Sequence, residues 1–496
     1  MSFTSEAFAA ARHDMATYHP HEATLPATGF KPIARSAPFA RAARVELPQG
    51  PLLNASADVR AGRLSCVGLL ERALEAVVRW GDVTAAVVTL LEDRARRDAK
   101  ALDQELSQGQ WRGPLHGIPI TVKDNIDVAG APTRAGSAAY NRLPEADAEA
   151  VRQLRRAGAL ILAKVATHEF ALGVTTPQAR HPMDASRIPG GSSGGSAISV
   201  ATGMALGSLG TDTRASIRVP SSLCGVVGFK PTYGALPVSG IVWLSWSMDH
   251  IGALAGSIGD AASVVSAISP SLAGLLQDAP RVVTGWRVGV PEAGFVGASD
   301  DVARTVRATL QMLADAGVDL VPTVVPSDED FRLANAAGLI ISRAEALAYH
   351  RSLGTDIERV WPETADQLRV AENLSATEYL DAQRFRRDLQ DRLGAPMNEL
   401  DLAALCMPTT LVTAPLRSEA ESFFTLLSRN AIPWSLIGWP AVSLPCPVPA
   451  GRLPIGLQIV APPFEDASLV SLGAAISASG NAPNGVLQGA DGDIQA

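Results

Sequence analysis

Apolar residues recur along the chain with two different spacings. In 65–80 they recur at helical spacing on one face, behind a capping Ser65, so this segment predicts a helix that Gly81 ends. Short uninterrupted apolar runs instead predict buried strands. By these criteria further helices are expected at 92–106, 149–156, 196–206 and 302–316, with a largely helical section over 331–394, and strands at 118–122, 158–165, 285–291, 318–325, 402–410 and 456–463.

The order of these segments indicates the fold class. A strand, a helix and a strand follow one another over 118–165 and again over 285–325, which is typical of α/β proteins with a parallel or mixed sheet covered by helices. The first 50 residues are rich in Ala, Pro and Arg with little period, so we expect an extended or partly ordered arm there. The last residues, rich in Gly, Asn, Asp and Ala, predict a loose tail.

Composition narrows the class of partner and the compartment. The chain has 496 residues, 47% of them hydrophobic, and a net charge of −8, which argues against a nucleic acid or an anionic membrane as its main partner. The uncharged stretches 189–211 and 430–451 are rich in Gly and Ser or in Pro, which spanning helices are not. Four cysteines without a CxxC pair, and no signal peptide pattern, favour a reducing, cytoplasmic location.

The segment PGGSSGGSA at 189–197 is the first candidate for chemistry. No Gly-Lys dipeptide occurs in the chain, which argues against a phosphate-binding loop. The segment matches the G-x-S-x-G nucleophile elbow, but that elbow needs a strand directly before it, and Pro182 and Pro189 argue against one. A tight glycine turn that opens a helix explains the glycines and leaves the two adjacent serines unexplained.

Lys123 and Ser216 are the second candidate. Lys123 ends the apolar run 118–122, and Ser216 lies in GTDTRASIR at 210–218. A serine hydroxyl needs a base, and lysine can serve when burial lowers its pKa from about 10.4 toward roughly 7 to 8. Only five lysines occur among the 42 Lys and Arg residues, which draws attention to each of them. A structural ion pair is the alternative role for Lys123.

Taken together and in order, these segments resemble the amidase signature family of Ser–cis-Ser–Lys hydrolases. The resemblance extends over roughly 60–475 and is carried by GPLHGIPITVKDNID, PGGSSGGSA, CGVVGFKPTYGALPVSG, SMDHIGALAGSIGD and GWPAVSLPCPVPAGRLPIGLQIV. It implies one large α/β domain at 61–477, a central mixed sheet with helices on both faces, between an N-terminal arm (1–60) and a flexible tail (478–496). It also implies cleavage of C–N bonds in amides, with aryl amides or carbamates among the candidates, without metal or cofactor.

The resemblance also implies roles for individual residues. Ser216 matches the nucleophile, Lys123 the base, and Ser192 the bridging serine, which follows a cis peptide bond after Gly191. The resemblance implies that Ser216 forms an acyl-enzyme with the substrate after its proton passes through Ser192 to Lys123. Water then hydrolyses the acyl-enzyme with the help of the same three residues. The backbone N–H groups of the 213–216 turn would stabilise the oxyanion, and this turn contains Thr213, Arg214 and Ala215.

Two features depart from the family's pattern. Arg214 and Ala215 stand where relatives usually carry glycines, and non-glycine residues resist positive φ, so a turn that needs it would be strained or reshaped. The loop 173–184 is shorter than the corresponding loop that relatives commonly carry, which would alter one wall of the pocket.

Trp243 and Trp246, with Gly191, are candidates for an apolar or aromatic substrate pocket, and packing in the core is the alternative for the two rings.

Several residues near these motifs have a structural interpretation. We expect Ser193 to hydrogen-bond the turn, Thr213 to act through its backbone, and Cys224 to be a small buried hydrophobe. The remaining expectations are that Asp212 and Arg218 pair to brace the turn, and that Asp249 and His250 pack behind the site.

Three functions remain open on the sequence. The first is a serine amidohydrolase acting on a small-molecule amide or carbamate, with no nucleic acid or membrane partner and a homodimer as one possible assembly. The second is the A-type subunit of a glutamine-dependent tRNA amidotransferase, which requires partner subunits. The third is a binding protein that lost catalysis through Arg214.

Overall fold

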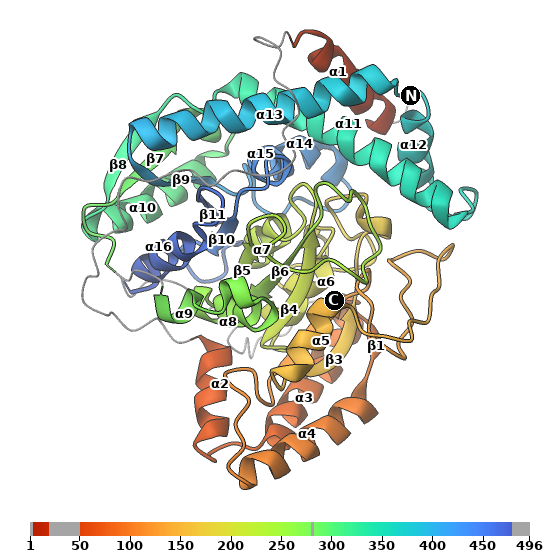
Figure 1. The fold of residues 1–496 in the computed structure, drawn as a ribbon, viewed down its shortest axis with the longest axis vertical. Helices are drawn as coiled ribbons and strands as arrows, with labels where there is room; N and C mark the ends of the chain where they lie inside the picture. Colours follow the sequence, from red (N-terminus) through yellow and green to blue (C-terminus); the bar gives the residue numbers. More distant parts are fainter. Residues whose placement is uncertain (1–2, 19–49, 279–281, 479–496) are drawn as a thin grey trace.

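An 11-stranded mixed sheet runs through the centre of the protein in a computed structural model that describes residues 3–18, 50–278 and 282–478. The strand order is β1-β3-β2-β4-β6-β5-β10-β11-β9-β7-β8 (Figure 1). The strands are β1 (Val87–Leu90), β2 (Pro119–Lys123), β3 (Leu160–Val165), β4 (Gly207–Asp212), β5 (Val227–Lys230), β6 (His250–Ala255), β7 (Arg287–Pro291), β8 (Asp319–Thr323), β9 (Leu402–Pro408), β10 (Ala441–Pro445) and β11 (Gly456–Val460).

Parallel pairs lie toward both ends of the sheet, and antiparallel pairs fill its middle. Strand β2 pairs in parallel with β3 and β4, and β7 pairs in parallel with β8 and β9. The strands from β4 through β6, β5, β10 and β11 to β9 are antiparallel neighbours, as is the edge pair β1 and β3. Parallel strands need crossover connections, and helices supply them here.

Helices cover both faces of the sheet. Along β6, Ile251 and Ala253 pack into the largest apolar cluster, whereas Leu254 points to the other face and packs with residues of α6 (Gly194–Ala201). The other α-helices are α1 (Phe3–Ala16), α2 (Pro51–Arg60), α3 (Cys66–Thr84), α4 (Glu92–Ser107), α5 (Glu149–Arg156), α7 (Arg218–Cys224), α8 (Ile258–Ile268), α9 (Leu275–Asp278), α10 (Asp300–Asp315), α11 (Asp328–Leu353), α12 (Pro362–Ala371), α13 (Ala376–Glu399), α14 (Phe424–Ser428), α15 (Ile432–Leu436) and α16 (Asp466–Ala478).

The longest helices gather at one end of the molecule. Helices α11 and α13 pack side by side there, and α1 lies across them, while α2, α3 and α4 occupy the opposite end (Figure 1). The N-terminal segment thus packs beside a helix some 300 residues later in the chain, as the ion pair of Asp14 with Arg332 shows. The α/β class with a central mixed sheet and helices on both faces is confirmed.

The predicted helices and strands are all present, with ends that differ by a few residues. Ser65 caps α3 and accepts the N–H of Gly68 at 2.9 Å, but Gly81 lies inside the helix, which ends at Thr84. Residues 3–16 and 51–60 are helical, so the described part of the N-terminal arm is not extended. The tail at 478–496 lies outside the described residues apart from Ala478, and the domain boundaries stay a prediction.

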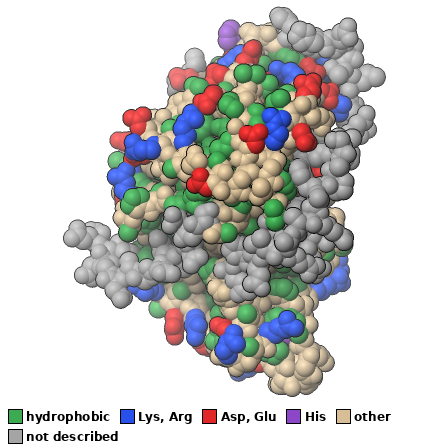
Figure 2. All heavy atoms as spheres, turned by 90° about the vertical axis from the view of Figure 1, so that its left-hand side faces the viewer, with side chains coloured by type: hydrophobic (Ala, Val, Ile, Leu, Met, Phe, Trp, Pro, Cys, Tyr) green, Lys and Arg blue, Asp and Glu red, His purple; other side chains and the backbone are tan. Residues whose placement is uncertain are grey.

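The surface carries mixed charge. On the face that Figure 2 shows, Lys and Arg side chains alternate with Asp and Glu, and neither sign gathers into a large area. Within the described ranges, no helix combines the length and the apolar character that crossing a membrane requires.

Candidate active site

Two parallel strands end at the same edge of the sheet and bring the candidate residues together. Strand β2 ends at Lys123, and its neighbour β4 ends at Asp212, with Val122 in register with Leu209. The chain then turns through 213–216 into α7. Because the two strands are parallel and adjacent, the lysine and the predicted nucleophile turn lie side by side although they are far apart in sequence.

The Lys123 ammonium group is held by two hydroxyls. Its Nζ lies 2.7 Å from Ser192 Oγ and 2.7 Å from Thr211 Oγ1. Burial lowers the pKa of Lys123 to about 7, although the charges of Asp249 and Asp212 act in the opposite direction. A lysine in this state loses its proton near neutral pH and can then act as a base.

Two other buried lysines have different partners. Lys164 lies 3.1 Å from the Asp124 carboxylate, and Lys230 donates to the carbonyl of Trp439 at 2.6 Å. The first lies in an ion pair, and a carbonyl has no proton to exchange with the second. Of these three buried lysines, only Lys123 donates to a serine hydroxyl.

The Ser192 segment forms a tight backbone turn against the end of β3. The peptide bond between Gly191 and Ser192 is cis, as the resemblance implies. The Ser192 carbonyl accepts the N–H of His168 at 3.1 Å and the hydroxyl of Thr176 at 3.2 Å. A Cβ at Gly195 would lie 2.4 Å from the Ala166 nitrogen, so only glycine allows the backbones to approach this closely.

The two serine segments touch through their backbones. The N–H of Ser193 donates to the Ser216 carbonyl at 3.2 Å, and its hydroxyl donates to the Thr211 carbonyl at 3.1 Å, so Ser193 braces the turn as predicted. Ser216 is buried, with 4% of its surface exposed. Among the described residues, the N–H groups of Arg214, Ala215 and Ser216 donate to no protein acceptor.

The turn accommodates its non-glycine residues without strain. Among the described residues with positive φ, neither Arg214 nor Ala215 occurs. The positions where relatives carry glycine therefore adopt conformations that any residue adopts, and the backbone N–H groups are retained.

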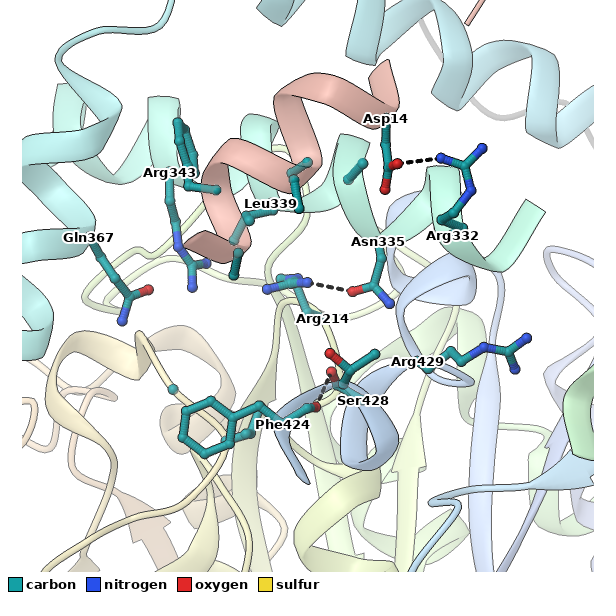
Figure 3. A pocket seen from close by; sticks show the side chains of 18 of the residues that line it. Asp14, Arg214, Arg332, Asn335, Leu339, Arg343, Gln367, Phe424, Ser428 and Arg429 are labelled. Carbon is teal, nitrogen blue, oxygen red and sulfur yellow. Dashed lines mark hydrogen bonds and ion pairs between the residues drawn. The ribbon is translucent and has the colours of Figure 1, made fainter. Parts of the chain in front are cut away.

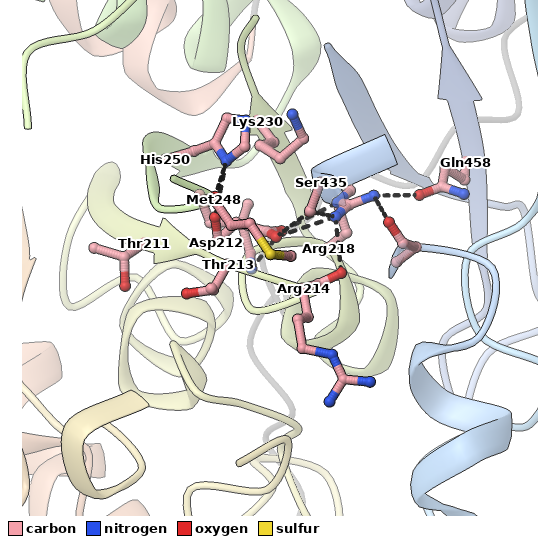
Figure 4. Close-up of polar contacts among 12 residues, drawn as sticks. Thr211, Asp212, Thr213, Arg214, Arg218, Lys230, Met248, His250, Ser435 and Gln458 are labelled. Carbon is pink, nitrogen blue, oxygen red and sulfur yellow. Dashed lines mark hydrogen bonds and ion pairs between the residues drawn. The ribbon is translucent and has the colours of Figure 1, made fainter. Parts of the chain in front are cut away.

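A buried ion pair braces this turn. The Arg218 guanidinium lies 3.0 Å from Asp212 Oδ1 and also donates to the Arg214 carbonyl at 3.2 Å (Figure 4). Burial alone would raise the pKa of Asp212, but the charge and hydrogen bonds of Arg218 hold that pKa below its ordinary value. Ser435 and Gln458 complete the network around the guanidinium, at 2.5 and 2.9 Å. The predicted bracing role of Asp212 and Arg218 is confirmed.

The residues behind the turn have structural contacts. The Thr213 hydroxyl donates to Asp249, which also accepts the N–H groups of Leu244 and Ser245 at 2.8 and 3.1 Å. His250 Nδ1 lies 2.6 Å from the Met248 carbonyl. Cys224, Asp249 and His250 are all buried, as expected.

A cavity of about 400 Å³ opens beside the turn. Arg214 projects into it from below and donates to Asn335 of α11 at 2.8 Å, while Arg343 and Gln367 reach in from α11 and α12 (Figure 3). Residues 172–174, at the start of the loop that the sequence singled out, form part of one wall.

The two tryptophans lie away from this cavity. Trp243 packs against the largest apolar cluster, and Trp246 is exposed. Gly191 lies in the backbone turn before Ser192. Neither tryptophan nor Gly191 lines the 400 Å³ cavity, and their role as a substrate pocket stays a prediction.

Sequence reasoning missed two polar residues of the site. Thr211 lies at the end of β4, inside the segment GTDTRASIR, and contacts Lys123, but that segment does not distinguish it from its neighbours. His168 is fully buried beside the Ser192 segment, and burial, with the charges of Arg343 and Lys123, lowers its pKa to about 3, so it is neutral. The described residues contain no group of three or more His, Cys, Asp or Glu that could hold a metal ion.

Comparison with known proteins identifies the family of this chain. The family model described as Amidase matches residues 69–470. The chain belongs to the amidase signature family. A crystal structure of an amidase shares 36% sequence identity with this chain, covers 86% of this chain and 99% of its own, and has a TM-score of 0.78.

Two curated relatives show the range of activities in the family. The 2-amino-5-chloromuconic acid deaminase of Comamonas testosteroni is 37% identical over 85% of this chain and 94% of its own length. The A-type subunit of the glutamyl-tRNA(Gln) amidotransferase of Anaeromyxobacter dehalogenans is 34% identical over 86% and 95%. The chain is a hydrolase of the amidase signature family that acts on non-peptide C–N bonds.

Proposed function

We propose that the protein hydrolyses a small-molecule amide or carbamate, with Ser216 as nucleophile, Ser192 as proton relay and Lys123 as base. The observation that carries the proposal is the 2.7 Å contact between Lys123 Nζ and Ser192 Oγ at a lysine whose pKa burial lowers to about 7. A neutral amine that contacts a serine hydroxyl can take its proton.

The reaction follows from this arrangement in two halves. Neutral Lys123 takes a proton from Ser192, which takes one from Ser216, and the Ser216 oxygen bonds to the substrate carbonyl carbon. The C–N bond then breaks as the proton returns through Ser192 to the leaving nitrogen. Water repeats the sequence on the acyl-enzyme, releases the acid and restores all three residues.

The turn supplies the groups that would bind the negative oxygen of the intermediate. The N–H groups of Arg214, Ala215 and Ser216 have no acceptor among the described residues, and the Arg218 contact with the Arg214 carbonyl holds the turn in place. Each such donor contributes about 3 kcal/mol to the stability of a transition state.

A Ser216→Ala variant tests the proposal. We expect its turnover of amides, anilides and carbamates to fall by roughly 10³-fold or more, because no nucleophile remains. Far-ultraviolet circular dichroism is the control for folding. Full turnover by this variant would remove Ser216 from the mechanism.

The second candidate is the A-type subunit of a tRNA amidotransferase, which the 34% identity with such a protein favours. That function requires partner subunits and ammonia from glutamine. Co-purification with two other proteins and tRNA-dependent glutaminase activity would support it. Activity of the isolated chain on simple amides would favour the first candidate, because no partner is then needed.

Covalent labelling distinguishes a catalytic protein from a binding protein that has lost catalysis. A fluorophosphonate reacts with an activated serine, so adduct formation at Ser216 supports catalysis and its absence supports the loss of catalysis.

The four cysteines are free and buried, which fits the cytoplasmic location that we propose. Aryl amides bound near Trp243 and Trp246, and a homodimer, are further parts of the proposal.

A further inference from the structure

The 400 Å³ cavity beside the nucleophile turn has the size of a site for a small ligand. Its walls come from the turn, the loop 172–174, α11, α12, α14 and the N-terminal helix α1. Segments that lie far apart in the sequence, from α1 to α14, therefore enclose it. Its charged groups determine which ligand fits.

Two guanidinium groups in this cavity, on the half-buried Arg214 and the buried Arg343, lack a carboxylate hydrogen-bond partner. Arg214 donates to the Asn335 amide oxygen at 2.8 Å, and Arg343 donates to the Ser342 hydroxyl at 3.0 Å. Neither forms an ion pair with any described residue, and the Nε of each is buried without a hydrogen-bond partner. Arg343 is 7% exposed. Burying unpaired charges is costly unless a ligand compensates for it.

The acids around the cavity do not neutralise this pair. Asp14 is paired with Arg332, and Asp328 is paired with Arg429. The charge of Glu363 does act on Arg343, but burial raises the pKa of Glu363 to about 7, so at neutral pH this carboxyl group compensates the two guanidinium charges only in part. The described part of the cavity thus has an excess of positive charge.

The cavity adjoins the proposed catalytic residues through two chain segments. Arg214 lies two residues before Ser216 in the same turn. The loop 172–174 continues into Thr175, whose nitrogen would lie 2.7 Å from a Cβ at Gly191, next to the cis bond. Ser216 itself does not line the cavity, so the inference below requires a substrate that extends from Ser216 past Arg214 into it.

We propose that the substrate carries a carboxylate and that Arg214 and Arg343 bind it. This inference rests on the proposed hydrolysis at Ser216 and specifies its substrate class. Guanidinium groups bind carboxylates through pairs of hydrogen bonds, and they stay charged in buried sites. The side-chain amides of Asn335 and Gln367, which also line the cavity, are polar neighbours that a carboxylate tolerates.

Matched substrates test the inference on the intact protein. N-(4-nitrophenyl)succinamic acid has a carboxylate in its acyl part, and 4-nitrobutyranilide is its neutral counterpart. N-acetyl-4-aminobenzoate and acetanilide form a second pair, with the carboxylate in the leaving amine. We expect the carboxylate member of at least one pair to have a kcat/KM roughly 30-fold higher. Equal or lower values in both pairs would overturn the inference.

Arg343→Gln removes the positive charge of Arg343, which lies on α11, and leaves the nucleophile turn with Arg214 unchanged. We expect this variant to lose roughly 30-fold or more of the preference for the carboxylate substrate, mainly through KM. Arg351→Gln, on the same helix but exposed and paired with Glu372, is the matched control and keeps the preference. A preference that Arg343→Gln does not change would also overturn the inference.

A binding measurement separates the inference from the proposed function. Calorimetry follows succinate, glutarate and benzoate binding to the Ser216→Ala protein, and methylphosphonate distinguishes a phosphate site. We expect one of the carboxylates to bind, and Arg343→Gln to abolish its binding. Binding of methylphosphonate alone, or of none of the four, overturns the inference. If Ser216→Ala retains full turnover, the proposed function fails, whichever of the four ligands binds in the calorimetry. If neutral amides are cleaved by Ser216 without a carboxylate preference, only the inference fails.

Discussion

Lys123 contacts the hydroxyls of Ser192 and Thr211 with its Nζ at the same distance, 2.7 Å, in a fully buried position. Both hydroxyls come from segments that follow Lys123 in the sequence by tens of residues. It places a lysine of lowered pKa between two hydroxyls, of which Ser192 is the proposed relay to Ser216 and Thr211 the proposed positioning group.

The pKa of Lys123 sets the acid limb of the pH profile. Burial lowers this pKa to about 7, so below pH 7 the amine is protonated and cannot accept a proton. We expect kcat/KM to rise about tenfold per pH unit below pH 7 and to level off above it. Rates measured from pH 5 to 9 check this.

A substitution at Lys123 is the control for this profile. Lys123→Arg keeps a positive charge that is not lost in this range, so activity should fall by roughly 10³-fold at every pH. An acid limb centred below pH 5 in the unmodified protein would assign the titration to another group.

We expect Thr211 to be a positioning residue whose hydroxyl favours the charged form of Lys123. In Thr211→Val the Nζ loses one acceptor that favours the charged form, so the pKa of Lys123 should fall further and the acid limb should move to lower pH. We expect kcat to fall about 10- to 100-fold, because the amine is less well oriented. Steady-state kinetics across pH measure both effects.

Thr211→Ser retains the hydroxyl and is the matched control. It should keep the position of the acid limb. If Thr211 has a merely structural role, the acid limb of the pH profile of Thr211→Val stays where it is, and only the stability of the variant falls.

The buried pair of Asp212 and Arg218 is expected to dominate the local stability of the turn. Asp212→Ala leaves the Arg218 charge buried without its partner, which should cost about 3 to 5 kcal/mol in the free energy of unfolding. Asp58→Ala breaks the exposed pair with Arg63 and should cost less than about 1 kcal/mol. Urea denaturation of the two variants measures both, and equal losses would contradict the account.

The sequence predicts the three candidate catalytic residues better than it predicts the residues that surround them. Lys123, Ser192 and Ser216 lie in motifs that are recognisable in the printed sequence. Thr211 shares a motif with Ser216, but its contact with Lys123, like the place of His168 beside Ser192, depends on which segments are neighbours in the fold. The adjacency of β2 and β4 is a property of the sheet order, and no local pattern specifies it.

Strand β4 shows why some elements were missed. Its sequence GSLGTD contains two glycines and few apolar residues, unlike the expected composition of a buried strand. The close packing explains this: a Cβ at Gly210 would lie 2.9 Å from a Leu254 side-chain carbon and 3.0 Å from Ser193 Oγ. The helix α1 was missed because its alanine-rich sequence has only a weak helical period of apolar positions; in the fold its Ala11 and Met15 pack against residues of α11.

The location of the nucleophile is the central claim, and mass spectrometry of the protein after reaction with a fluorophosphonate tests it most directly. We predict one adduct, on the peptide that contains Ser216, with no adduct in Ser216→Ala and much slower labelling in Lys123→Ala. An adduct on Ser192 or Ser193 that persists in Ser216→Ala would contradict the account.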